Sequence, residues 1–257
     1  MVANLENKKY IYMRTLVIPD LHGKSIWKLI THLEKPNKVV FLGDYFDCYN
    51  TFSTAEQIYN FKEILDYKKS GGAEVIMLIG NHDHHYFPEI GNTGTSGYQH
   101  IGKYEIEYVI NENREHLQMA YQMDKYLFTH AGVSEVFMNN IFGKQGWNIE
   151  NIAEELNELF KHKPHAFTFS GIDGYGYDVE QTPIWIRPSS LMKANKTSDI
   201  KKKYIQIVGH TGVLKIDKKG NSTGKRYYFV DTFETSMEYL VIEDNKLTFK
   251  SLNNAKD

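Results

Sequence analysis

Short runs of apolar and β-branched residues recur along the chain. Each is five or six residues long, and a run of this length without polar alternation is typical of a strand buried on both faces. Five such runs lie at residues 13–18, 38–42, 74–79, 125–129 and 204–208. They predict the central strands of the fold.

Between several of these runs, apolar residues follow the period of an amphipathic helix. The best-marked start is Ser53-Thr54-Ala55-Glu56, a capping box that predicts a helix running to about residue 67. Further amphipathic segments lie at residues 23–33, 101–117 and 149–160. Strands that alternate with helices indicate an α/β fold.

The C-terminal part has a different pattern. Residues 226–252 contain strand-like runs in succession, with a polar turn at Asp244-Asn245. No internal repeat, proline-rich linker or shift in composition marks a boundary, so we expect a single domain over residues 1–257.

The segments that follow the five runs carry the chemistry. They read PDLH, GDYFD, GNHD, HAG and GHT. In α/β sheets, ligands bind just outside the carboxyl ends of the strands, where loops converge. We therefore expect one rim of the sheet to carry Asp20, His22, Asp44, Asp47, Asn81, His82, His130 and His210.

Composition narrows the class of protein. The 257 residues are 41% hydrophobic and 24% charged, as in a globular chain, and a net charge of −2 gives no basic excess for binding nucleic acid or an anionic membrane. The N-terminus lacks a signal-peptide pattern, and no apolar stretch is long enough for a membrane helix. The single cysteine, Cys48, excludes an intramolecular disulfide and favours a reducing compartment, so we expect a cytoplasmic protein.

Carboxylate, imidazole and amide ligands in one set suit a divalent metal of intermediate hardness, such as Mn, Fe or Zn. Six plausible ligands are too many for one catalytic ion with an open position. They suit two ions that share a bridging carboxylate, as in phosphatases and nucleases.

The ordered motifs Asp-x-His, Gly-Asp-x-x-Asp, Gly-Asn-His-Asp, His-Ala-Gly and Gly-His-Thr, from Asp20 to His210, resemble the calcineurin-like metallophosphoesterase superfamily. Within it, the chain looks most like the small bacterial and phage Ser/Thr phosphoprotein phosphatases and their dinucleoside-tetraphosphatase relatives. The resemblance implies two packed mixed β-sheets flanked by helices, a four-layer αββα sandwich. It also implies a phosphatase that needs two divalent ions, Mn in the first place, with Fe or Zn as alternatives.

The resemblance gives each motif residue a role. Asp20 and His22 would hold one metal, Asp44 would bridge both, and the second metal would be held by Asn81, His130 and His210. A hydroxide bridging the metals would attack phosphorus directly. His82, oriented by Asp47, would be the general acid, and Arg187 in PIWIRPSS would bind the phosphate.

Two features that point in different directions leave the substrate open. Cys48 and Tyr49 stand where the phosphoprotein phosphatases usually have Arg-Gly, whereas Gly212 after Gly-His-Thr agrees with that group. We expect a phosphomonoesterase of the Ser/Thr phosphatase type acting on a phosphoprotein. One alternative is a hydrolase of dinucleoside polyphosphates or nucleotides, with Tyr175, Tyr177 or Trp147 stacking on a base. Another is a non-catalytic binding scaffold, which the retained catalytic residues disfavour.

Three neighbours of the Asn81-His82 pair match no ligand position. We expect His84 and His85 at the rim or the surface. Asp83 is expected to fix its loop through backbone hydrogen bonds. Cys48 is expected to be a small buried hydrophobic residue.

Overall fold

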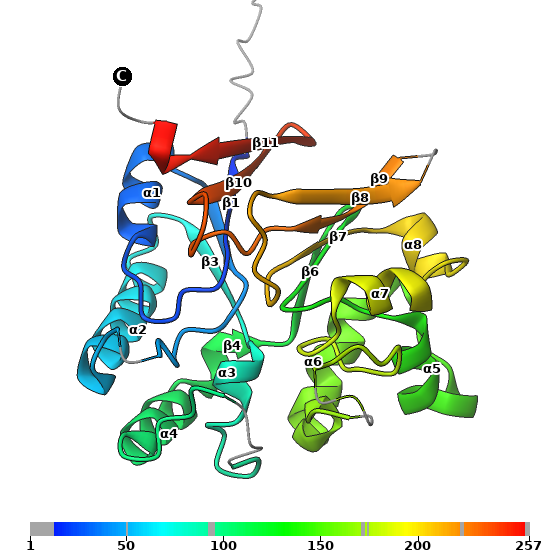
Figure 1. Ribbon diagram of the computed structural model, residues 1–257, viewed down its shortest axis with the longest axis horizontal. Helices are drawn as coiled ribbons and strands as arrows, with labels where there is room; N and C mark the ends of the chain where they lie inside the picture. Colours follow the sequence, from blue (N-terminus) through cyan, green and yellow to red (C-terminus); the bar gives the residue numbers. More distant parts are fainter. Residues whose placement is uncertain are drawn as a thin grey trace, which may run out of the picture.

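The computed structural model describes residues 13–49, 51–91, 96–170, 173, 175–221 and 224–254. Its strands form two mixed sheets that lie side by side in the middle of the molecule (Figure 1). The first sheet has the order β11-β10-β1-β2-β3-β4 and the second the order β5-β6-β7-β9-β8. The predicted α/β class and the two packed mixed sheets flanked by helices are confirmed.

All five predicted core runs form strands. Three lie side by side and parallel in the first sheet, and two are parallel neighbours in the second. They are β1 (Thr15–Ile18), β2 (Lys38–Phe41), β3 (Glu74–Leu78), β6 (Tyr126–Thr129) and β7 (Ile205–Val208). Because neighbouring strands run in the same direction, the loops after them emerge at the same edge of each sheet.

The C-terminal strands also form, but they divide between the sheets. β9 (Gly224–Phe229) pairs with β7 in the second sheet, whereas β10 (Glu238–Glu243) pairs antiparallel with β1 in the first. β10 and β11 (Lys246–Ser251) form a hairpin across Asp244 and Asn245, whose φ angles of 49° and 61° suit a tight two-residue turn. Three further strands complete the sheets: β4 (Leu117–Gln118), β5 (Ala120–Met123) and β8 (Asp217–Asn221).

Helices cover the outer faces of both sheets, which gives the α/β/β/α arrangement (Figure 1). The outer side of the first sheet carries α1 (Trp27–Glu34) and α2 (Thr54–Lys69). On the second sheet, α6 (Ile152–His162) packs against β5. The remaining helices are α3 (Asn81–His84), α4 (Lys103–Glu112), α5 (Glu135–Phe142), α7 (Pro188–Ala194) and α8 (Asp199–Lys203). No helix in the described ranges is both long and apolar enough to cross a bilayer.

The helix predictions were right in kind but not always in extent. The capping box of α2 is present, because Ser53 Oγ accepts from Glu56 N and Ser53 N donates to Glu56 Oε2. The helix expected at 101–117 ends at Glu112, and the chain then forms a 3₁₀ turn and β4. Residues 117–118 pair with β3, and that sheet pairing overrides the local helical pattern.

The core between the two sheets consists of alternate strand residues. Val17 of β1, Val40 of β2 and Leu78 of β3 meet Phe128 of β6 and Ile207 of β7, and all five side chains are fully buried. The intervening residues of the first sheet face the helices instead. This apolar layer holds the two sheets together below the rim that carries the polar loops.

At that rim, the loops after β2 and β3 approach very closely. A Cβ on Gly80 would lie 2.0 Å from Asp44 Oδ1, and one on Gly43 would lie 2.4 Å from Gly80 N. Both positions therefore require glycine. Asp44 itself has a φ of 53°, a left-handed conformation that costs energy and that the surrounding contacts must hold.

Asp83 supplies those contacts. Its carboxylate accepts hydrogen bonds from the backbone N–H groups of Asp44, Tyr45 and Gly80, at 2.7, 2.8 and 2.8 Å. The expectation that Asp83 fixes its loop is borne out. Cys48 is buried as expected, and its Sγ exchanges hydrogen bonds with the backbone of Phe52.

His84 and His85, which were expected at the rim or the surface, are both buried. His84 is 2% exposed and His85 is fully buried. α3 is a single turn inserted into the protein, so its side chains point into the molecule on every side. His84 Nε2 lies 3.0 Å from Pro164 O and the ring packs against Phe87 and Phe160.

Replacing Asp83 should test how the β2 and β3 loops are held. Asp83→Ala leaves three buried N–H groups without an acceptor, and each costs about 1–3 kcal/mol, so we expect the free energy of unfolding to fall by about 3 kcal/mol or more. Asp83→Asn keeps one acceptor oxygen and should cost about half as much or less. Urea unfolding of both variants measures the difference, and equal stabilities of Asp83→Ala and wild type would contradict this role.

His84 should make stability depend on pH. Burial lowers the pKa of His84 from 6.5 to about 4, so between these values the unfolded chain binds a proton that the folded protein does not. The free energy of unfolding should therefore fall as the pH drops through this window, by about 3 kcal/mol from His84 alone. Urea unfolding at graded pH should show a shallower loss in His84→Gln. Identical slopes in the variant and the wild type would show that His84 is not the group responsible.

Candidate active site

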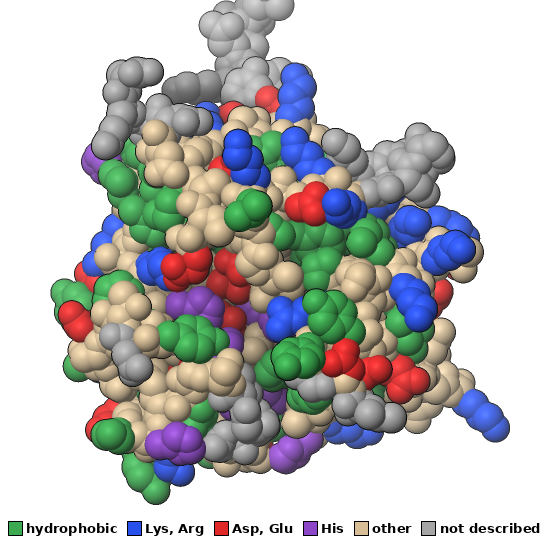
Figure 2. Space-filling view, viewed as in Figure 1, with side chains coloured by type: hydrophobic (Ala, Val, Ile, Leu, Met, Phe, Trp, Pro, Cys, Tyr) green, Lys and Arg blue, Asp and Glu red, His purple; other side chains and the backbone are tan. Residues whose placement is uncertain are grey.

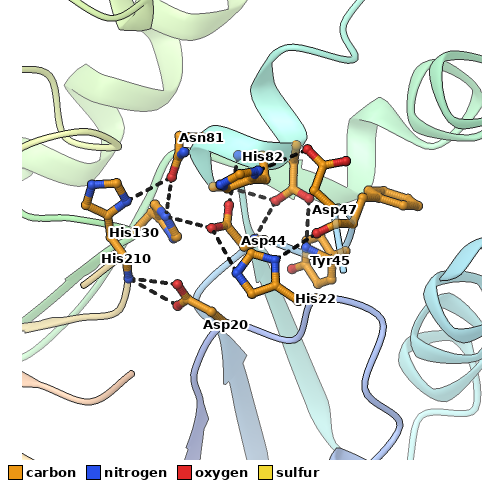
Figure 3. Close-up of polar contacts among 12 residues, drawn as sticks. Asp20, His22, Asp44, Tyr45, Asp47, Asn81, His82, His130 and His210 are labelled. Carbon is orange, nitrogen blue, oxygen red and sulfur yellow. Dashed lines mark hydrogen bonds and ion pairs between the residues drawn. The ribbon is translucent and has the colours of Figure 1, made fainter. Parts of the chain in front are cut away.

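The motif residues meet at the rim between the two sheets, as Figure 3 shows for eight of them and Tyr45. Asp20 follows β1, His22 lies two residues later, and Asp44 follows β2. Ligand atoms of these three residues lie within 4.8 Å of one another. His22 Nδ1 donates to Phe46 O at 2.9 Å, which leaves Nε2 without a hydrogen and 3.7 Å from Asp44 Oδ2. The three form a first group of candidate ligands.

A second group lies on the other side of Asp44. Asn81 Oδ1 is 2.9 Å from His130 Nε2 and 2.8 Å from His210 Nδ1. The other nitrogen of each ring is held by a backbone carbonyl: His130 Nδ1 by Leu42 O at 2.8 Å and His210 Nε2 by Trp185 O at 3.1 Å. A carbonyl can only accept, so in the neutral rings the hydrogens lie on these outer nitrogens.

The second group therefore brings acceptors together. When both rings are neutral, their hydrogens lie on the outer nitrogens, and the lone pairs of Asn81 Oδ1, His130 Nε2 and His210 Nδ1 converge within hydrogen-bonding distance. Lone pairs at this separation repel unless a cation binds among them. Histidine ligands whose second nitrogen is fixed by a carbonyl are the usual arrangement at protein metal sites. The residues present thus fit a divalent metal ion.

Asp44 lies between the two groups. Its Oδ2 is 3.7 Å from His22 Nε2 and 3.4 Å from His130 Nε2, and its Oδ1 accepts from His82 N at 2.9 Å. No other described carboxylate lies between His22 and His130 in this way. Asp20 is fixed by the backbone of the second group, since His210 N donates to both of its oxygens at 3.2 and 2.9 Å.

The charges of the rim favour a cation. Burial alone would lower the pKa of His130, but the carboxylates of Asp44 and then Asp20 raise it to about 10. Burial, and next the neighbouring Asp231, hold the pKa of Asp20 well above its usual value. Both shifts show that negative charge is concentrated here. A positive charge near these carboxylates, from a proton or from a metal ion, therefore stabilises the site. Metal binding at such a site displaces protons.

His82 and Asp47 form a separate pair beside Asp44. His82 Nδ1 lies 2.9 Å from Asp47 Oδ2. Burial would lower the pKa of His82, but Asp44 and the hydrogen bond to Asp47 raise it. Both carboxylates therefore favour the protonated ring. Its edge lies against His22 of the first ligand group, with ring centroids 5.2 Å apart.

The surroundings of Asp47 were not anticipated from the sequence. Tyr86 Oη donates to Asp47 Oδ1 at 2.6 Å and Gln99 Nε2 donates to the same oxygen at 3.1 Å. His85 Nε2 lies 2.8 Å from Asp47 Oδ2. Tyr86 and Gln99 belong to none of the five motifs, so the sequence does not mark them as site residues.

A further acidic residue, Asp231, was also missed. Burial raises its pKa to about 6, with Asp44 as the next cause. It lies two residues after the end of β9, as Asp20 lies two residues after the end of β1. That position could have identified it from the sequence.

Arg187 lies beside the second ligand group. Its Nε donates to Tyr175 O at 2.8 Å, and its Nη1 lies 3.4 Å from His210 O and 3.2 Å from Thr211 Oγ1. Among the described residues, Nη2 makes no hydrogen bond. The guanidinium is thus anchored at one edge, and its other edge can bind an anion.

Figure 2 shows this face hollowed at its centre, where histidine and acidic side chains gather. Tyr49, Tyr175 and Tyr177 are all exposed. Tyr49 is close to the first group, with its ring centroid 6.1 Å from those of both His22 and His82. Trp147 is placed differently: its indole donates to Asn139 of α5, a contact outside the ligand groups.

Comparison with known proteins agrees with this geometry. Residues 13–232 match the family model of calcineurin-like phosphoesterases. A search of curated proteins found no match.

Two solved structures illustrate the likeness in fold. A cold-active protein-tyrosine phosphatase of a psychrophilic Shewanella species has 15% identity and a TM-score of 0.59, with 93% of this chain and 80% of that chain covered. A Saccharomyces cerevisiae Ser/Thr phosphatase similar to human PP5 has 13% identity and a TM-score of 0.54, with 93% and 79% covered.

The family match covers most of the chain and every segment that carries a candidate ligand of the two groups. The chain therefore belongs to the calcineurin-like phosphoesterases and is a metal-dependent hydrolase of phosphoric esters.

Proposed function

We propose that this protein is a dinuclear phosphomonoesterase of the Ser/Thr phosphatase type, with Mn²⁺ as its metal. The observation that carries the proposal is the position of Asp44 between two ligand groups, with the His82–Asp47 pair beside it. One group holds Asp20 and His22, and the other holds Asn81, His130 and His210. Oxygen ligands next to imidazoles suit Mn²⁺, and Fe or Zn would fit the same set.

The metals would divide the chemistry with the protein. Two bound ions would screen the phosphoryl charge and supply the attacking oxygen, which is the usual contribution of paired metals. The chain itself provides the remaining functions. Asp44 and its neighbours fix the spacing of the ligands, and the carbonyls behind the histidines fix the orientation of the rings.

Arg187, which lies beside the second ligand group, would bind the phosphoryl group with the free edge of its guanidinium. Its contacts to Tyr175 O and Thr211 Oγ1 hold the guanidinium plane in place. A guanidinium can bind two phosphate oxygens at once, and an ammonium cannot reproduce that geometry.

His82 would protonate the leaving oxygen. Asp47 holds Nδ1, so the opposite nitrogen, Nε2, can carry a proton toward the substrate. Asp47 is itself held ionised: burial would raise its pKa, but the hydrogen bond with His82 and the nearby ring of His85 lower it. A fixed carboxylate behind an imidazole sets the tautomer and stabilises the imidazolium.

A nucleotide or dinucleoside polyphosphate remains the second candidate substrate. The observation in its favour is the exposed pair Tyr175 and Tyr177 beside Arg187, which could stack on a base. A non-catalytic scaffold is disfavoured, because the proposed ligands, Asp47 and His82 are all present and assembled. We further propose one domain over residues 1–257 and a cytoplasmic location, in keeping with the single free cysteine.

Arg187 provides the first test. A charge-assisted bidentate contact contributes about 1.5–3 kcal/mol, so Arg187→Ala should lower kcat/KM about 10- to 100-fold, with part of the loss in KM. Arg187→Lys should recover little of it, because Lys cannot form the paired contact. Steady-state kinetics with Mn²⁺ measure both variants. Wild-type kinetics in Arg187→Lys would remove Arg187 from the site.

His82 provides the decisive test of the function. A serine alkoxide is a poor leaving group and needs the proton, whereas p-nitrophenolate leaves readily without it. We expect His82→Asn to lower kcat/KM by about 10²–10⁴ for a phosphoserine peptide and much less for p-nitrophenyl phosphate. Activity should depend on Mn²⁺, and elemental analysis should find two ions in wild type and variant alike.

The matched control is His84→Gln, a buried histidine of the same turn that contacts neither ligand group, which should keep both activities. Equal losses across leaving groups would show that His82 does not protonate the leaving oxygen. If wild type cleaves dinucleoside polyphosphates but does not hydrolyse a phosphoserine peptide, the second candidate function is correct.

A further inference from the structure

A third set of metal-binding atoms lies behind the proposed dinuclear centre. Two imidazole nitrogens converge on one carboxylate oxygen: His82 Nδ1 and His85 Nε2 lie 2.9 and 2.8 Å from Asp47 Oδ2. Ligand atoms of the three residues all lie within 4.8 Å of one another. All three residues are buried.

His85 is the unusual member of this set. It is fully buried, yet neither of its ring nitrogens has a properly aligned hydrogen bond to the described residues. The 2.8 Å contact to Asp47 has the distance of an ion pair without that alignment. A buried polar group without a partner is costly, so its retention needs a reason. Its lone pair and the carboxylate oxygen can both bind the same cation.

The other oxygen of Asp47 is already occupied. Tyr86 Oη and Gln99 Nε2 both donate to Oδ1. These two bonds fix the carboxylate plane and leave Oδ2 directed at the two histidines. The carboxylate is therefore held in the orientation that a metal bound by Oδ2 and both rings would require.

From this geometry we propose that Asp47, His82 and His85 form a third metal site, selective for zinc-like ions, and that its occupation inhibits the enzyme. Two imidazoles and one carboxylate, with a fourth position open, are a common ligand set for Zn²⁺. Zinc–ligand bonds of about 2.0–2.2 Å place tetrahedral ligand atoms about 3.4 Å apart. The observed 2.8 and 2.9 Å would need to widen by only about half an ångström.

This site should bind more weakly than the dinuclear centre. Each histidine of that centre has its second nitrogen fixed by a backbone carbonyl, whereas His85 Nδ1 has no partner among the described residues. Loss of such an outer partner lowers metal affinity about 10- to 100-fold. The third ion should therefore bind only when metal is in excess over the two tighter positions.

Inhibition follows from the atom that the metal occupies. An imidazolium carries hydrogens on both nitrogens, so a metal on His82 Nδ1 excludes that form of the ring. It also takes Asp47 Oδ2, which would otherwise orient the ring. This part of the inference rests on the proposed role of His82 as the general acid, whereas metal binding at the site does not.

Binding and inhibition can be measured separately. Protein is first loaded with two equivalents of Zn²⁺ and then titrated with more, with calorimetry and elemental analysis giving the number of ions bound. A parallel titration with Co²⁺ reports four-coordinate geometry through its visible absorption. Wild type should take a third equivalent, and hydrolysis of a phosphoserine peptide should fall as that equivalent binds.

His85→Gln should keep two equivalents and weaken the third by at least about 10- to 100-fold, with the same shift in the concentration that inhibits. His84→Gln, the equally buried neighbour, should behave as wild type in both titrations. If His85→Gln does not fold, as judged by thermal unfolding, Asp47→Asn replaces it in the binding titration, because it removes the charge of the shared ligand.

Two equivalents only in wild type, or a third that survives in His85→Gln, would overturn the site. A third ion that is lost in His85→Gln but does not slow hydrolysis would overturn the inhibition. A wild-type protein with no phosphatase activity at all would refute the proposed function, while the binding titration would still decide whether the third site exists.

Discussion

The active site depends on one close approach of backbone, where the loop after β2 meets the loop after β3. Glycine at positions 43 and 80 leaves room for it, and Asp83 holds it by accepting three N–H groups from the two loops. Asp44 takes a left-handed conformation as a result. The strain is stored at Asp44, the carboxylate that lies between the two candidate ligand groups, and strained residues cluster at functional sites.

Around Asp44, backbone carbonyls determine which ring nitrogen can bind a metal. Phe46 O, Leu42 O and Trp185 O each take the outer hydrogen of one histidine, and the inner nitrogens turn toward the carboxylates and Asn81. This arrangement fixes the ligand atoms before any metal ion binds. It lowers the entropic cost of binding, because the side chains need little reordering.

The proposed general-acid pair and the proposed third metal site share Asp47 and His82. Asp47 orients His82 through one oxygen, and that oxygen also faces His85. The negative charge of Asp47 favours a proton on either neighbouring imidazole, and the same charge favours a bound divalent cation. The pair proposed to supply a proton to the substrate is therefore also the pair that would bind excess metal.

The sequence by itself determined much of this protein. Near-continuous apolar runs predicted β1, β2, β3, β6 and β7, and polar residues directly after them predicted one shared rim, because parallel strands present their carboxyl ends together. It could not place His84 and His85 correctly. The helix α3 has only one turn, which is too short for a periodic apolar pattern to show that its side chains are buried. The sequence also contained no sign of Tyr86 or Gln99 at Asp47, nor of which ring nitrogen each histidine presents. Only the tertiary structure decided these points, because they depend on carbonyls and side chains contributed by distant segments, and hydrogen bonds between such segments leave no periodic pattern in the sequence.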